Sequence, residues 1–261
     1  MNNILTVTLI QTHLFWEDIA ANLQQLTQKI ATIDNTDLIV LPETFSTGFS
    51  MRATALAEDV NSSTAINWMR TIAAQKHCVV TGSLMLKDKN LFYNRLIWMR
   101  PNGTYQFYNK RHLFSLSAEP QVFTPGTERL IVELNGWKIC PLICYDLRFA
   151  TWARNSVNHH PDQIPDYDIL LYVANWPERR NTAWKTLLPA RAVENLAYAV
   201  GVNRVGVDGE NVTHTGNSMV VDALGNTLYY QENTEAVFTV ELHSTHLKQV
   251  RKMYPFLKDA D

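Results

Sequence analysis

The segment ICPLICYD, residues 139–146, is an apolar run that stops at Cys144 and continues at once with polar residues. This pattern predicts a buried strand that ends at the edge of a sheet and places a thiol there. Two other apolar runs end in a similar way, one at Glu43 and the other at Asn175 and Trp176. Because loops at strand ends carry functional groups on a rigid scaffold, these residues together predict a nucleophilic site.

The composition limits what the protein does. Its 261 residues are 46% hydrophobic and 18% charged, which provides enough apolar material for one large α/β domain or two small ones. With a net charge of −2 and no basic stripe in the sequence, we expect no binding to nucleic acid or to an anionic membrane. The apolar runs are strand-length, so we expect no membrane span, and the N-terminus resembles a first strand rather than a signal peptide. Three cysteines do not make a disulfide framework, which predicts a reducing, cytoplasmic location.

Strand and helix patterns alternate along the chain. The spacing of apolar residues predicts helices at residues 16–30, 64–75, 147–155 and 182–198. Short apolar or alternating runs predict strands at residues 5–9, 38–41, 78–84, 91–99, 104–108, 130–134, 137–144, 169–175, 198–205, 219–223 and 227–230. We expect a polar loop at residues 156–165 and a C-terminal helix with a tail at residues 244–261.

The second half of the chain repeats the first at an offset of about 120–130 residues. The strand at 169–175 matches that at 38–41, and the hairpin around Leu224-Gly225-Asn226 matches that around Pro101-Asn102-Gly103. We therefore expect one α/β domain, residues 1–261, in which two sheets pack face to face with helices outside. Two separate domains are the alternative, but no Gly/Ser/Pro-rich linker divides the halves. The tail from about residue 244 could dock on a partner subunit.

Several side chains are candidates for chemistry. Cys144 could be a small buried hydrophobe, but a strand-to-helix turn would leave backbone N–H groups free to activate its thiol and bind an oxyanion. Glu43 directly follows apolar residues, and such a desolvated carboxylate suits proton transfer. Lys110 lies in an apolar setting where an ammonium could steady a negative oxygen, and Glu119 follows it. The alternative for all three charged residues is a solvated surface position. Cys140 lies within a strand, and its spacing from Cys144 does not suit zinc.

Three motifs occur in an order that resembles the Glu-Lys-Cys triad of the nitrilase, or carbon–nitrogen hydrolase, superfamily. They are Leu-Pro-Glu43, Lys110-Arg-His-Leu-Phe and Cys144-Tyr-Asp-Leu-Arg-Phe, and the flanking resemblance covers nearly the whole chain. The resemblance implies an αββα sandwich in which Cys144 is the nucleophile and Glu43 is the general base. It implies that Lys110 and the backbone N–H of Tyr145 bind the oxyanion, and that Glu119 helps to orient the site. It further implies a homodimer and a reaction that needs no metal and no organic cofactor.

Within this superfamily the chain resembles the ω-amidase branch, through CYDLRF at residues 144–149 and ANWPERR at residues 174–180. This branch releases ammonia from the ω-amide of α-keto dicarboxylic acid monoamides, such as 2-oxoglutaramate and 2-oxosuccinamate. These small molecules carry a carboxylate at the far end, and the planar guanidinium of arginine suits a carboxylate. We expect Arg180 to bind it and Trp176 to form a wall of the pocket.

Two further arginines lie near the motifs, and we expect both to be structural. Arg148 and Arg191 are expected to pair with nearby acids, and Arg191 and Glu194 have the i, i+3 spacing of a helical ion pair. Ala150 stands where many relatives have proline, which affects only the shape of the local loop.

The same triad also serves other reactions. An amidohydrolase of N-carbamoyl amines or acids and a nitrilase are alternatives that the sequence leaves open. A thiol redox sensor or an oligomeric binding module is an alternative outside enzymology, against which the intact Glu43, Lys110 and Cys144 argue.

Overall fold

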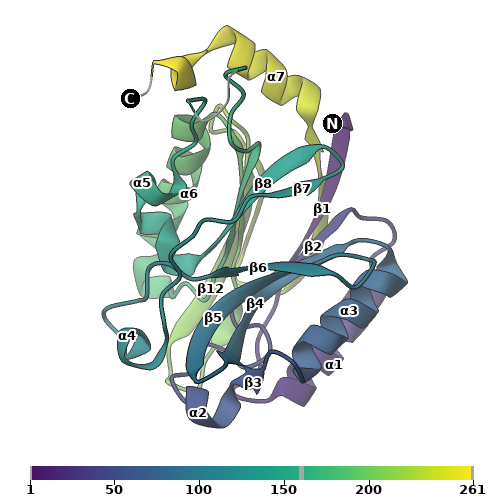
Figure 1. Ribbon diagram of the computed structural model, residues 1–261, viewed down its shortest axis with the longest axis vertical. Helices are drawn as coiled ribbons and strands as arrows, with labels where there is room; N and C mark the ends of the chain where they lie inside the picture. Colours follow the sequence, from purple (N-terminus) through teal and green to yellow (C-terminus); the bar gives the residue numbers. More distant parts are fainter. Residues whose placement is uncertain (1, 159–161, 260–261) are drawn as a thin grey trace.

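Two mixed β-sheets form the frame of the protein, for which the computed structural model describes residues 2–158 and 162–259. The strand order of the first sheet is β14 (Ala236–His243), β1 (Ile4–Gln11), β2 (Leu38–Val40), β4 (Val79–Asp88), β5 (Leu91–Met99) and β6 (Tyr105–Asn109), with β3 (Glu58–Asp59) beside β4. The order of the second is β11 (Val205–Val207), β12 (Thr213–Val221), β10 (Tyr198–Val202), β9 (Ile169–Val173), β8 (Trp137–Ile143) and β7 (Val132–Leu134), with β13 (Thr227–Glu232) beside β12. Helices flank both sheets (Figure 1).

The two sheets follow the same plan, which explains the repeat in the sequence. In the first sheet β1, β2 and β4 are parallel, and β5 is antiparallel to β4. In the second sheet β8, β9 and β10 are parallel, and β12 is antiparallel to β10. The β5–β6 and β12–β13 hairpins occupy equivalent places. The expected α/β sandwich of two similar halves is therefore confirmed.

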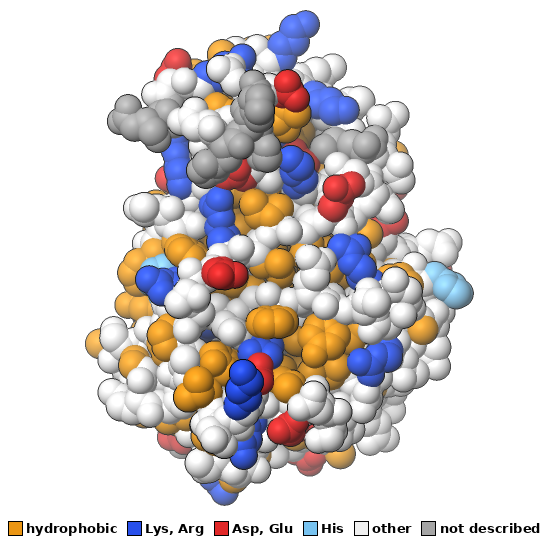
Figure 2. All heavy atoms as spheres, viewed as in Figure 1, with side chains coloured by type: hydrophobic (Ala, Val, Ile, Leu, Met, Phe, Trp, Pro, Cys, Tyr) orange, Lys and Arg blue, Asp and Glu red, His pale blue; other side chains and the backbone are white. Residues whose placement is uncertain are grey.

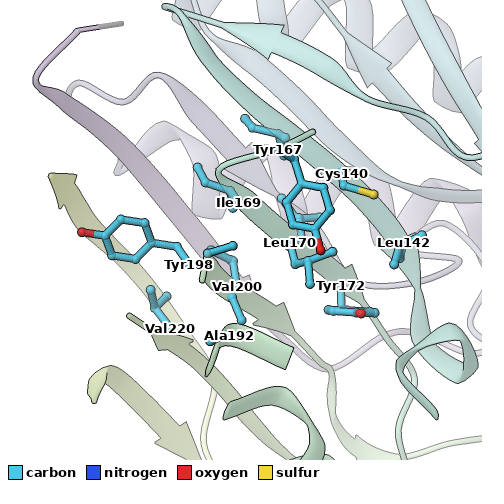
Figure 3. Packing of buried hydrophobic residues seen from close by; sticks show 14 of the residues in the cluster. Cys140, Leu142, Tyr167, Ile169, Leu170, Tyr172, Ala192, Tyr198, Val200 and Val220 are labelled. Carbon is cyan, nitrogen blue, oxygen red and sulfur yellow. The ribbon is translucent and has the colours of Figure 1, made fainter. Parts of the chain in front are cut away.

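The main cluster of buried apolar residues fills the space between the two sheets and continues between the second sheet and the helix α6 (Asn181–Asn195). Leu5, Val7 and Leu9 alternate along β1 and belong to this core, together with buried residues of β8, β9 and β10. Figure 3 shows a part of it, in which Cys140 of β8 lies among apolar and aromatic neighbours that include Tyr167. Burial raises the pKa of Cys140 to about 12, which keeps this thiol neutral among its apolar neighbours.

Outer helices complete the layers on both sides. α1 (Ile19–Ala31) and α3 (Thr64–Lys76) pack on the first sheet, and their apolar residues form a second cluster with the outer face of β2 and β4. α6 (Asn181–Asn195) covers the second sheet, where Trp184 and Leu188 enter the main core. The shorter helical segments are α2 (Ala53–Leu56), α4 (Glu119–Val122), α5 (Ala150–Ala153), η1 (Cys144–Arg148), η2 (Glu178–Arg180) and η3 (Phe256–Lys258). Among the described residues, no helix is long and apolar enough to span a bilayer.

The helix expected at residues 147–155 is wrong. This segment holds the end of the 3₁₀ helix η1 and the single turn α5, because the chain leaves the helical conformation at Phe149 (φ −109°, ψ 85°). The Asp146 carboxylate accepts hydrogen bonds from the N–H groups of Ile143 and His112, so it ties η1 to the sheet edge. That tertiary anchoring, absent from the local pattern, prevents one continuous helix.

Two strand assignments also needed the tertiary structure. The strand expected at residues 198–205 divides into β10 and β11, because the Asn203 side chain accepts from the Trp176 N–H and donates to the Trp176 carbonyl. β14 is not among the strands that the sequence predicts, because residues 236–243 lack a regular apolar–polar alternation; in the structure Val237 and Phe238 are exposed. Its pairing with β1 over eight residues defines it. Residues 159–161 of the expected polar loop and 260–261 of the expected tail lie outside the described residues.

The C-terminal helix α7 (Ser244–Met253) packs on its own chain, at the end of the molecule seen at the top of Figure 1. Leu247 and Val250 are buried, and Arg251 pairs with Asp168 at 2.6 Å and donates to the Leu196 carbonyl at 2.8 Å. Docking of this segment on a partner subunit stays a prediction.

On the face drawn in Figure 2, side chains of both charges are interspersed around a central group of hydrophobic ones.

Candidate active site

Three strand ends meet at the interface of the two sheets. Glu43 follows β2, Cys144 follows β8, and Asn175 follows β9. The backbone N–H of Asn175 donates to Glu43 Oε2 at 2.8 Å, which joins an end of the first sheet to an end of the second. Lys110 comes directly after β6 and brings its ammonium to the same place. The structure thus brings together the thiol, carboxylate and amide that the sequence placed at strand ends.

Cys144 occupies a backbone conformation that side chains rarely adopt, with φ +43°. It is the first residue of η1, and the first N–H groups of a helix have no acceptor inside that helix. The N–H of Tyr145 therefore lies beside the thiol and is available to a ligand. Burial raises the pKa of the Cys144 thiol well above its usual value, and Glu43, which hydrogen-bonds the thiol, raises it further. The resting group is a neutral thiol that needs a base.

Lys110 is enclosed between two carboxylates. Its Nζ lies 2.9 Å from Glu43 Oε1 and 2.9 Å from Glu119 Oε1. All three side chains are buried, with the lysine side chain 1% exposed. Burial alone would lower the pKa of Lys110, but Glu119 and Glu43 more than offset this and hold it above its usual value. Burial also raises the pKa of Glu119, against the opposing effect of Lys110. The site therefore holds a permanent cation next to the thiol.

The backbone on both sides of Lys110 is fixed. Its N–H donates to the Asn94 carbonyl at 2.9 Å, and its carbonyl accepts from the Gly126 N–H at 2.9 Å. A Cβ at position 126 would lie 2.1 Å from the Asn109 carbonyl oxygen, so only glycine allows this approach. These contacts hold the ammonium in register with Glu43.

Asn94 is a part of the site that the sequence reasoning missed. It lies on β5 and is 1% exposed. Its Nδ2 donates to Glu43 Oε1 at 2.8 Å and to Glu119 Oε1 at 3.3 Å, so one amide group bridges both carboxylates. The signal in the sequence is a single amide inside a largely apolar strand, which the hairpin pattern alone does not distinguish.

Asp146 ties the nucleophile turn to the lysine loop. Its Oδ2 accepts from the Tyr108 hydroxyl at 2.7 Å, and its Oδ1 accepts from the His112 N–H at 3.0 Å. The same carboxylate accepts from the N–H of Ile143, just before the nucleophile. The turn at Cys144 and the loop at Lys110 are thus held by one buried side chain.

A cavity of about 370 Å³ opens over these groups. Glu43, Lys110 and Cys144 line it, as do Tyr145, Trp176 and Arg180, which the sequence predicted for binding. Its other walls come from elements far apart in the chain: Trp16, Phe49–Arg52, Phe114, Leu116, Ser117, Arg148, Asn175, Pro177, Arg179, Asp208, Glu210, Val212 and His214. Glu119 does not line the cavity, but it contacts three residues that do, namely Lys110, Phe114 and Ser117. The size fits a small organic molecule.

Comparison with known proteins agrees with this geometry. The family model described as carbon–nitrogen hydrolase matches residues 6–252. The chain belongs to the carbon–nitrogen hydrolase family. This hydrolase is 41% identical over 260 residues to the omega-amidase YafV of Escherichia coli K12. The match covers 98% of this chain and 97% of that protein. It is 31% identical to a 2-oxoglutaramate amidase of Bacillus subtilis over 85% of this chain and 84% of that protein.

A solved structure gives the same result for the fold of this hydrolase. XC1258 from Xanthomonas campestris, described as a CN-hydrolase superfamily protein with an arsenic adduct in the active site, superimposes with a TM-score of 0.97. The two chains are 40% identical, and the match covers 100% of this chain and 98% of the other. The chain is therefore a hydrolase that acts on carbon–nitrogen bonds.

Of the two arginines that the sequence predicted to be structural, only one has that role in the described structure. Arg191 is structural, as expected, since it pairs with Glu194 at 2.9 Å and donates twice to the Leu147 carbonyl. The expectation that Arg148 pairs with an acid is wrong: in the described parts of the chain it forms no ion pair. It is exposed, lines the cavity, and lies with its Cζ 5.1 Å from the centre of the Trp176 ring.

The groups that line the site suit acyl-transfer chemistry. Within residues 2–158 and 162–259, no group of three or more His, Cys, Asp or Glu side chains has an arrangement that could hold a metal ion. What the cavity presents is a thiol, a carboxylate in contact with it, an ammonium and a free backbone N–H. Together these can form and resolve a covalent intermediate at a carbonyl carbon.

Proposed function

We propose that this protein is an ω-amidase, which hydrolyses the terminal amide of α-keto dicarboxylic acid monoamides such as 2-oxoglutaramate and 2-oxosuccinamate. The products are ammonia and the dicarboxylic acid, and the reaction passes through a thioester on Cys144. The observation that carries the proposal is the buried cluster in which Lys110 lies 2.9 Å from Glu43 beside the thiol. The names of the omega-amidase and 2-oxoglutaramate amidase relatives support the choice of amide.

The first half of the reaction forms the acyl-enzyme. Glu43 takes the proton of the Cys144 thiol as sulfur attacks the amide carbon, because the raised thiol pKa makes a spontaneous thiolate rare. The carbonyl oxygen becomes an oxyanion, which accepts hydrogen bonds from the Lys110 ammonium and the Tyr145 N–H. When the intermediate collapses, the carbon–nitrogen bond breaks and Glu43 returns its proton to nitrogen. Ammonia leaves, and the thioester remains.

The second half of the reaction releases the acid. Glu43 takes a proton from a water molecule, whose oxygen attacks the thioester carbon. The oxyanion forms again between Lys110 and Tyr145, and its collapse breaks the carbon–sulfur bond. The thiol of Cys144 regains a proton from Glu43, and the dicarboxylate product leaves the cavity. Glu119 and Asn94 act as positioning residues, since they contact Lys110 and Glu43 and do not line the cavity.

Substrate binding uses the wall of the cavity next to the thiol. Arg180 lies with its Cζ 4.5 Å from the centre of the Phe114 ring, and we assign it to the far carboxylate of the substrate. Trp176 is held by a 2.8 Å hydrogen bond from its Nε1 to the Arg180 carbonyl, and we assign it as a wall of the pocket. If the assignment of Arg180 is correct, Arg180→Ala raises KM for 2-oxoglutaramate; an unchanged KM contradicts it.

A substrate panel tests the proposal. Ammonia release from 2-oxoglutaramate is compared with release from N-carbamoyl amines, N-carbamoyl acids and nitriles, with Cys144→Ala as the inactive control. We expect the α-keto amide to have the highest kcat/KM. A higher kcat/KM for an N-carbamoyl compound or a nitrile would replace the ω-amidase assignment and keep the triad.

Assembly and location form a separate part of the proposal. We propose a cytoplasmic homodimer of single-domain subunits, on the basis of the family resemblance and the three cysteines, which are free thiols. Light scattering on the purified full-length chain measures the mass, and a monomer would contradict the dimer.

A further inference from the structure

Three guanidinium groups lie on one side of the cavity without a carboxylate partner. They belong to Arg148, Arg179 and Arg180, which line the cavity together with Cys144. Within the described residues, none of the three forms an ion pair. The contrast is Arg52 at another part of the cavity, which is paired with Glu17 at 2.5 Å. The positive charge near the thiol is therefore left for a ligand.

Two of these arginines rest on aromatic rings that are themselves fixed. Arg148 lies over Trp176, with Cζ 5.1 Å from the ring centre, and Arg180 lies over Phe114 at 4.5 Å. The Trp176 indole donates to the Arg180 carbonyl, and the Phe114 N–H donates to Glu119. A stacked guanidinium keeps its in-plane N–H donors free, which suits two-point contact with a carboxylate.

The grouping of these charges is unfavourable in the free protein. Burial lowers the pKa of Arg180, and the nearby Arg179 and Arg148 lower it further, while Cys144 acts in the opposite direction. Like charges held together in a cavity favour an anionic ligand that relieves their repulsion.

We propose that Arg148 is a specificity-determining residue that shares the far carboxylate of the substrate with Arg180. The inference rests on the proposed ω-amidase function and deepens it. The substrate class is an amide with a carboxylate at the opposite end. Two guanidinium groups, from the turns η1 and η2, bind that carboxylate.

The spacing along η1 agrees with this role. Arg148 follows Cys144 by four residues, and a 3₁₀ helix rises about 2 Å per residue, so their backbones are about 8 Å apart. In 2-oxoglutaramate, four carbon–carbon bonds of about 1.5 Å each separate the amide carbon from the carboxylate carbon. The long arginine side chain spans the remaining gap. An amide carbon at the thiol thus leaves the carboxylate within reach of Arg148.

The test compares two amides that differ only in the far group. Glutaramate carries a carboxylate where pentanamide carries a methyl group, and kcat/KM for ammonia release is measured for both. The variants are Arg148→Gln and Arg148→Lys, with Arg52→Gln as the control that removes one positive charge elsewhere on the cavity wall. Thermal melting of each full-length variant confirms folding. Binding of glutaramate to Cys144→Ala, with and without Arg148→Gln, gives a readout that does not need turnover.

We expect Arg148→Gln to lower kcat/KM for glutaramate about tenfold, through a higher KM, and to leave pentanamide unchanged. Arg148→Lys should lower kcat/KM for glutaramate less than Arg148→Gln does. Arg52→Gln should lower the logarithm of kcat/KM for glutaramate by less than half as much as Arg148→Gln. An unchanged ratio of the two substrates in Arg148→Gln, or an equal loss in Arg52→Gln, overturns the inference and leaves the proposed function standing. If the wild type hydrolyses neither amide nor 2-oxoglutaramate, the proposed function fails, and weaker glutaramate binding on loss of Arg148 still supports the carboxylate site.

Discussion

Asn94 provides a test of how the general base is positioned. Its Nδ2 donates to Glu43 Oε1 at 2.8 Å inside a buried cluster. Its Oδ1 has no hydrogen-bond partner within the described structure, so the Nδ2 contacts are the interactions of this side chain with the site. Replacing Asn94 with alanine removes a hydrogen bond to a charged group and leaves Lys110 and Asn175 to hold the carboxylate.

The size of the effect follows from the type of bond. A hydrogen bond to a charged group contributes about 1.5–3 kcal/mol, which corresponds to about 10- to 150-fold in rate if it is needed in the transition state. We therefore expect Asn94→Ala to lower kcat for 2-oxoglutaramate by that factor with little change in KM, because Asn94 does not line the cavity. Steady-state ammonia release over a range of substrate concentrations separates the two constants.

A matched control distinguishes positioning from general loss of stability. Thr81 is fully buried in β4, and its hydroxyl donates to the Ile97 carbonyl at 2.9 Å, away from the cavity. Thr81→Val removes one buried hydrogen bond and should lower the melting temperature without a change in kcat. If Asn94→Ala keeps wild-type kcat, or if both variants lose kcat in proportion to their melting temperatures, the positioning role is wrong.

Three further predictions concern the charged cluster. Lys110→Gln leaves Glu43 and Glu119 buried without their cation, so it should lower the free energy of unfolding, measured in urea, by about 3–5 kcal/mol. The control Lys185→Gln breaks an exposed ion pair and should change the free energy of unfolding by less than about 1 kcal/mol. Glu119→Gln weakens the hold on Lys110 and should lower kcat about tenfold at constant KM in the ammonia assay; wild-type kcat would exclude a positioning role. Since Glu43 raises the pKa of the Cys144 thiol, Glu43→Gln should move the thiolate titration, followed by ultraviolet absorbance against Cys144→Ala, to lower pH; an unchanged or higher midpoint contradicts this.

Residues at the ends of buried strands were predictable from sequence, and residues that depend on tertiary contacts were not. Glu43 and Cys144 each follow an apolar run, so the local pattern places them at the sheet edge where the structure has them. Asn94 lies inside a hairpin strand, and its role arises only because β5 passes next to the end of β2. Nothing local distinguishes it from a polar residue on a solvated strand face.

The same limit explains the errors in the loops after the strands. The segment after Cys144 has apolar residues at helical spacing, but the hydrogen bonds of Asp146 to the Tyr108 and His112 regions fix a short 3₁₀ turn instead. Arg148 follows acidic Asp146 closely in sequence, yet that carboxylate is turned inward and saturated, so the guanidinium packs on Trp176. In both the turn after Cys144 and the contact of Arg148, the orientation of the side chains determines the structure, and the spacing of residues in the sequence does not reveal that orientation.

The central claim, that Cys144 forms a thioester with the substrate, has a direct test. The full-length protein is mixed with 2-oxoglutaramate, quenched in acid at short times, digested, and measured by mass spectrometry. We predict a transient acyl adduct on the peptide that contains Cys144 and no such adduct in Cys144→Ala. In the Glu43→Gln variant, acylated with an activated ester, the same adduct should persist for longer than in the wild type. An adduct on Cys78 or Cys140 instead, or full amidase activity of Cys144→Ala, would contradict the claim.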